Sequence, residues 1–104
     1  MSKSPVNKYM KEGEKEVSKF LSSVNINWMY HTPILLLDEE ELREIWNPNF
    51  YLYEFGIYIV IIDDANKDKF EKIKSMYQLN KISVIYIEVY KEQKKWKFLS
   101  LIHI

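Results

Sequence analysis

The chain has 104 residues and no cysteine, and it has only two glycines, Gly13 and Gly56. The absence of cysteine excludes disulfides, thiolate metal sites and cysteine nucleophiles. Two isolated glycines cannot build a glycine-rich phosphate loop, which argues against a dinucleotide-binding or P-loop enzyme. No apolar run approaches the ~20 residues that cross a bilayer, and the N-terminus lacks the apolar run of a secretory signal. We therefore expect a cytoplasmic protein with no membrane partner.

Charge of either sign is also not in excess, because fifteen Lys and Arg residues balance fifteen Asp and Glu residues. This balance gives no support for a broad nucleic-acid-binding surface, so any such surface would be local. What the chain does have is apolar residues, which make up 47% of it. At this length and composition we expect a single folded domain over residues 1–104.

Hydrophobic periodicity and turn residues predict an alternation of helices and strands. Residues 34–37 are compatible either with an extension of the first strand or with a separate short strand. For residues 91–104 we favour a strand over a helix. The other expected elements are a helix from Ser4 to about Ser22, a strand over 25–31, a short helix over 38–46, a hairpin of 49–53 with 57–62, a helix over 65–79 and a strand over 82–89.

The run Ile57 to Ile62 carries no charged residue, which is typical of a central strand covered on both faces. Asp64 or Asn66 can cap the helix that follows. A strand, a helix and another apolar strand predict a right-handed parallel crossover. The fold class we expect is therefore α/β, a mixed sheet with helices on its faces.

The phrases Pro48-Asn49-Phe50-Tyr51-Leu52 and Gly56-Ile57-Tyr58-Ile59, together with this order of elements, resemble the PD-(D/E)XK nuclease superfamily. That superfamily includes restriction endonucleases and Holliday-junction resolvases. The resemblance covers about residues 12 to 89 and implies a restriction-endonuclease-like core of the order α-β-β-β-α-β. It also implies a homodimer, since resolvase-like members usually act as pairs.

The same resemblance implies where nuclease chemistry would reside. Two carboxylates on adjacent strands would hold Mg²⁺ against the scissile phosphate, and a lysine would orient the attacking water. In this sequence the first acid falls on Asn49, the second on Val60 and the lysine on Ile62. None of these three side chains carries the carboxylate or amine that the chemistry requires, so we expect no catalytic residues, no metal site and no cofactor.

Other acids offer a displaced active site as an alternative, and Mg²⁺ would be needed only then. Glu14 or Glu16 matches the acid on the first helix of the superfamily, and Glu54 and Asp63 flank the central strand. Asp63 and Asp64 also have a simpler interpretation as a helix cap and an exposed turn acid, which we favour.

Four lysines on the second predicted helix are candidates for phosphate contacts, although a solvated face is the commoner role of such residues. His31 and His103 are more simply structural than metal ligands. The aromatic residues suit a core or a dimer interface better than base stacking. The candidate DNA contacts are Lys67, Lys69, Lys72 and Lys74.

The favoured expectation is a catalytically inactive nuclease-fold protein that binds DNA or a protein of a DNA-processing or anti-defence system. One alternative is a divergent metal-dependent endonuclease that uses the displaced acids. The other is a pure protein-interaction domain that dimerises or binds another protein.

Overall fold

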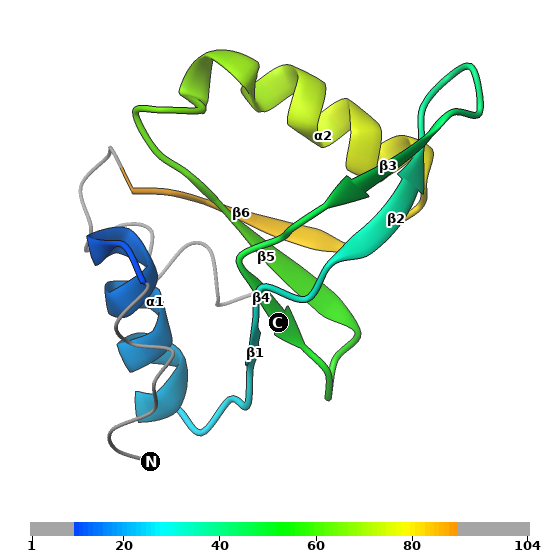
Figure 1. The fold of residues 1–104 in the computed structure, drawn as a ribbon. Helices are drawn as coiled ribbons and strands as arrows, with labels where there is room; N and C mark the ends of the chain where they lie inside the picture. The colour runs from blue at the N-terminus through cyan, green and yellow to red at the C-terminus, as the bar shows by residue number, and fades with distance from the viewer. Residues whose placement is uncertain (1–9, 90–104) are drawn as a thin grey trace.

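The computed structural model describes residues 10–89, which form a four-stranded mixed sheet in the order β1-β4-β5-β6 and a separate two-stranded sheet of β2 and β3. Figure 1 shows α1 on one side of the larger sheet and α2 on the other, with the β2–β3 hairpin beside α2. The elements are α1 (Glu12–Ser23), β1 (Met29–Tyr30), β2 (Ile34–Leu37), β3 (Arg43–Trp46), β4 (Phe50–Leu52), β5 (Ile57–Ile62), the 3-10 turn η2 (Lys67–Lys69), α2 (Phe70–Leu79) and β6 (Val84–Glu88).

Strand β5 is an interior strand of the larger sheet, as its sequence predicted. It pairs antiparallel with β4, so that Phe50 lies opposite Ile59, and parallel with β6. The β4–β5 hairpin and the β5-α2-β6 unit are thus confirmed. The α/β class with a mixed sheet is confirmed as well.

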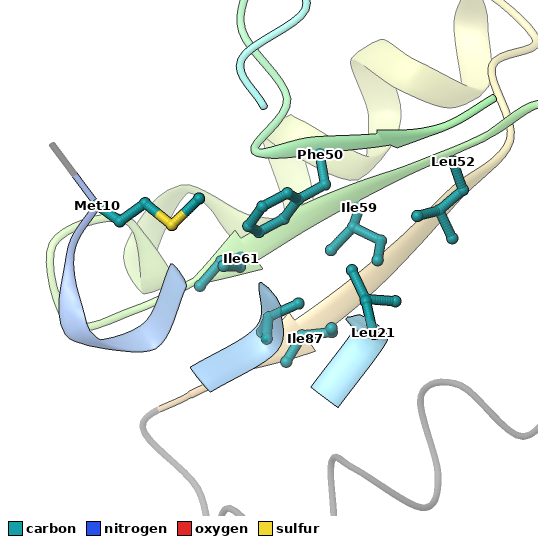
Figure 2. Packing of buried hydrophobic residues seen from close by; sticks show 8 residues of the cluster. Met10, Leu21, Phe50, Leu52, Ile59, Ile61 and Ile87 are labelled. Carbon is teal, nitrogen blue, oxygen red and sulfur yellow. The ribbon is translucent and has the colours of Figure 1, made fainter. Parts of the chain in front are cut away.

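One face of the sheet packs against α1. Side chains that alternate along β5, Ile59 and Ile61, point to this face and are almost completely buried. Figure 2 shows them between Phe50 and Leu52 of β4 and the residues of α1, with Met10 closing one end. The fully buried members of this cluster are Val17, Leu21, Phe50, Leu52, Ile59 and Ile87.

The other face of the sheet packs against α2 and the β2–β3 hairpin. Val60 and Ile62 point to this side, where Met76 and Tyr77 of α2 and Leu36 of β2 cover them. The strand therefore buries residues on both faces, which explains why the run 57–62 contains no charge.

The short helix expected over 38–46 is wrong, since these residues form the end of a hairpin. The carboxylate of Asp38 accepts hydrogen bonds from the backbone N–H groups of Glu40 (2.8 Å) and Leu42 (2.9 Å), which closes the turn. Glu41 takes a left-handed conformation with φ of 64°. The acidic run thus serves as a turn, in which Asp is a favoured residue.

Other boundaries differ in detail. The first strand is limited to Met29–Tyr30, and Ile34–Leu37 is a separate strand rather than its extension. The helix expected from residue 65 begins as the 3-10 turn η2. A Cβ at Gly13 would lie 3.3 Å from Cγ1 of Val89, so this glycine allows α1 to approach the end of β6. The expected helix start at Ser4 and the expected strand over 91–104 lie outside the described residues.

Candidate functional site

Glu14 is the centre of the candidate site. It lies in the first turn of α1, and only 4% of its surface is exposed. Its Oε1 accepts hydrogen bonds from the backbone N–H of Lys11 and from the hydroxyl of Tyr30, both at 2.9 Å. Its Oε2 lies 2.7 Å from Nδ2 of Asn49 and 3.2 Å from Nε2 of His31. We call Glu14, Tyr30, His31 and Asn49 the Glu14 cluster.

Asn49 links this cluster to the central strand. Its amide nitrogen donates to Glu14, and its Oδ1 accepts a 2.7 Å hydrogen bond from the backbone N–H of Ile61. Its own backbone N–H donates to the carbonyl of Ile59. The ladder with β5 ends at Phe50, which lies opposite Ile59, so Asn49 directly precedes the first paired residue of β4. Each polar atom of the Asn49 side chain thus has a fixed partner.

The hydrogen bonds determine the ionisation of the cluster. Burial alone would raise the pKa of Glu14, but the backbone N–H of Lys11 and the side chains of Asn49, Tyr30 and His31 outweigh burial and lower that pKa. Burial and the hydrogen bond to Glu14 raise the pKa of Tyr30 to about 12. Glu14 is therefore a carboxylate at neutral pH, and Tyr30 is a neutral donor.

A cleft of about 320 Å³ lies beside the cluster, between α1, the end of β5 and α2. Glu14, Asn49, Val60 and Asp63 all contribute to its lining. Val60 presents only methyl groups to it, and Ile62 is fully buried in the cluster under α2. The two positions at which the resemblance would place the second acid and the lysine thus bring neither a ligand nor a base to the cleft.

The displaced acids do not form one group. Asp63 lies on the cleft, but its carboxylate accepts the backbone N–H groups of Ala65 (3.0 Å) and Asn66 (3.2 Å). Glu54 lies in the β4–β5 turn, before β5 rather than after it, and accepts a hydrogen bond from Asn27. Glu16 is half-buried on α1. Within residues 10–89 no three His, Asp or Glu side chains are grouped closely enough to hold a metal ion.

The candidate DNA contacts lie on η2 and α2. Lys67 pairs with Asp64 at 3.1 Å, and Lys74 lies 3.7 Å from Glu71 and 5.0 Å from the centre of the Phe70 ring. Lys69 and Lys72 are exposed, and Lys72 faces a second hollow. The other charged residues around that hollow are Asp38, Glu39, Glu40 and Glu44.

Sequence reasoning missed the contribution of Tyr30 and His31 to this site. Their signal was weak, because a Tyr-His pair at the end of a short strand has no recognisable spacing to Glu14. It also missed Asn66, which was expected only as a helix cap. Asn66 instead accepts the backbone N–H of Asp63 at 2.7 Å and donates to the carbonyl of Ile61 at 3.2 Å. His103 lies outside the described residues.

Neither helix in the described part of the chain is long and apolar enough to cross a membrane. No family model, no curated protein and no solved structure matches this chain.

Proposed function

We propose that this chain is a catalytically inactive, nuclease-like domain of the restriction-endonuclease type that works by binding another protein. The order of its elements supports this proposal. If the β2–β3 hairpin is set aside as an insertion, the described elements run α1, β1, β4, β5, α2, β6. This order is compatible with the α-β-β-β-α-β core of PD-(D/E)XK nucleases.

One observation carries the proposal: the direct 2.7 Å hydrogen bond between Asn49 and Glu14. In a metal-dependent nuclease, carboxylates at such positions share a divalent cation, whose charge holds them together. Here an amide N–H takes the place of the cation and satisfies the carboxylate without a metal. Val60, which lines the same cleft, has no side-chain oxygen to offer.

The arrangement of charges favours a protein partner over DNA. Two of the four candidate lysines have an acidic neighbour, and Lys72 lies beside the acidic β2–β3 turn. The acids of this turn would repel DNA phosphates that approach Lys72. Binding of DNA remains the alternative, and a salt titration separates the two because phosphate contacts weaken steeply with salt.

Calorimetry with Mg²⁺ and Mn²⁺ tests the loss of catalysis. We expect no heat of binding with the natural protein, and we expect binding with the double variant Asn49→Asp/Val60→Glu, which restores both carboxylates. Asn47→Asp/Val60→Glu is the matched control. It adds the same charges, but Asn47 is an exposed residue of the same cleft, and we expect it to leave metal binding absent.

Two results would contradict the proposal. Metal binding by the natural protein, lost in Asp63→Ala, would instead support a divergent nuclease built on Glu14 and Asp63. A double variant that folds and stays silent would mean that positions 49 and 60 are not the emptied metal ligands.

A further inference from the structure

The two edges of the β2–β3 hairpin differ, because the edge of β2 is capped at Leu37 and the edge of β3 is open within the described residues. On β2, the side chain of Asn80 bonds to both the backbone N–H and the carbonyl of Leu37, each at 2.9 Å. These bonds show that the main-chain groups of Leu37 point away from β3. Because paired residues alternate along an antiparallel ladder, the main-chain groups of Arg43 and Ile45 on β3 also point outward. No strand within residues 10–89 pairs with that edge.

The outer face of the same hairpin is apolar and exposed. Ile45 exposes 70% of its surface and lies opposite Leu35, which exposes 56%. Leu37 extends this face toward the turn with 40% of its surface exposed, and Leu42, which is 60% exposed, lies in the turn itself. Neighbouring exposed aliphatic side chains of this kind typically mark a binding surface.

The hairpin as a whole is strongly negative, and most of its acids lie at its turn and around the hollow on its other face, whereas Arg43 lies on the apolar face opposite Leu37. Between residues 34 and 46 the chain has five acids against one base, Arg43, so the segment carries a formal charge of −4. The whole chain is neutral, so the charge is a local property of the hairpin. A strand that pairs with β3 gains from positive charge on those of its side chains that point toward the acidic face.

We infer that the edge of β3 binds an extended polypeptide segment in which apolar residues alternate with lysine or arginine. Such a segment adds a third strand, takes up the outward main-chain groups of Arg43 and Ile45, and covers the exposed aliphatic face. Its basic side chains lie near the acidic turn. Four aliphatic residues are too few for the roughly 800 Å² per partner of a standard interface, which favours a single strand over a globular surface.

This inference deepens the proposed function, since it names the surface and the chemistry of the protein partner. It does not depend on the Glu14 cluster. A failure here leaves the metal calorimetry unchanged, so the two proposals can fail separately.

The test is the affinity of the full chain for a short fluorescent peptide in which lysine alternates with valine. We expect saturable binding that weakens as salt is raised, and no binding of peptides in which glutamate replaces lysine or serine replaces valine. Ile45→Ser should weaken binding about tenfold, because it removes one buried aliphatic contact. Phe55→Ser is the matched control, since this exposed residue lies in the β4–β5 turn, and binding should stay unchanged.

A second variant separates strand addition from simple charge attraction. Arg43→Pro removes one outward N–H and also one positive charge. Strand pairing predicts weaker binding of the lysine peptide, whereas pure charge attraction predicts stronger binding and would overturn the inference. If the proline variant does not fold, the affinity of Ile45→Ser for the peptide is the deciding measurement. Equal binding to Ile45→Ser and the natural chain, or sedimentation showing that a second copy of the chain occupies this edge, would also overturn it.

Discussion

The contact between Asn49 and Glu14 can be tested by adding a single charge. Asn49→Asp keeps the size of the side chain but places a second carboxyl where an amide N–H now lies 2.7 Å from Oε2 of Glu14. Two unit charges at that distance repel by about 6 kcal/mol at an effective dielectric constant of about 20. The folded protein can avoid this energy by protonating one of the two carboxyls, which then donates a hydrogen bond as the amide did.

Protonation therefore limits the loss of stability and makes it depend on pH. Keeping a carboxyl with an ordinary pKa near 4 protonated costs about 4 kcal/mol at pH 7 and about 1.5 kcal/mol at pH 5. In the variant the shared proton has a raised pKa in the folded state, so stability is lost as the pH rises. We expect Asn49→Asp to be about 4 kcal/mol less stable than the natural protein at pH 7, and much closer to it at pH 5.

Urea unfolding followed by tryptophan fluorescence measures these values, in the presence of a chelator so that no cation screens the pair. Trp28 packs edge-on against Phe50, and Trp46 packs edge-on against Tyr77, so the two hydrophobic clusters both contain a reporter. Asn47→Asp controls for the added charge and should change stability by less than about 0.5 kcal/mol. An equal loss at both pH values, or no loss at pH 7, would refute the direct Asn49–Glu14 contact.

Two further predictions concern the same contacts and the hairpin. Glu14→Gln should cost about 2 kcal/mol at pH 7 through weaker hydrogen bonds. The folded-state pKa of Glu14 lies below its ordinary value of 4.5, so the natural protein loses this advantage over the variant as the pH falls below about 4.5. A difference in urea stability between the two proteins that stays constant down to pH 3 would contradict this account. Asn80→Ala should lower the thermal midpoint, with a loss of about 1–3 kcal/mol, since the side chain bonds to Leu37 twice and to the carbonyl of Met76. Gln78→Ala, an exposed change in the last turn of α2 just before Asn80, should have little effect, and equal midpoints for the two variants would show that Asn80 does not hold β2.

Sequence predicted the sheet better than the hairpin beside it. The uncharged run 57–62 could be identified as a central strand, because its composition reflects burial on two faces. Residues 38–46 were misread because acids at the start of an apolar pattern resemble a helix N-terminus. The structure uses the same acids differently, since Asp38 satisfies two turn N–H groups and Leu35 and Ile45 pair across strands.

For the site, sequence could identify which positions matter but not how they are connected. Asn49 and Glu14 were both named from a resemblance, and the structure brings them together. The roles of Tyr30 and His31 depend on where α1 crosses the sheet, and no spacing along the chain encodes that. Glu54 and Asp63 looked equivalent as acids near β5, but they lie before and after it, about 20 Å apart along a strand of that length.

The hydrogen bonds between the side chain of Asn80 and β2 affect how this chain behaves at high concentration. A two-stranded ribbon with two open edges can add a neighbour on each side, which permits copies to stack without limit into fibres. Here one amide mimics the main chain of a missing strand and caps the edge of β2 at Leu37. The ribbon therefore adds a neighbour more readily along β3, whose edge no strand of residues 10–89 covers.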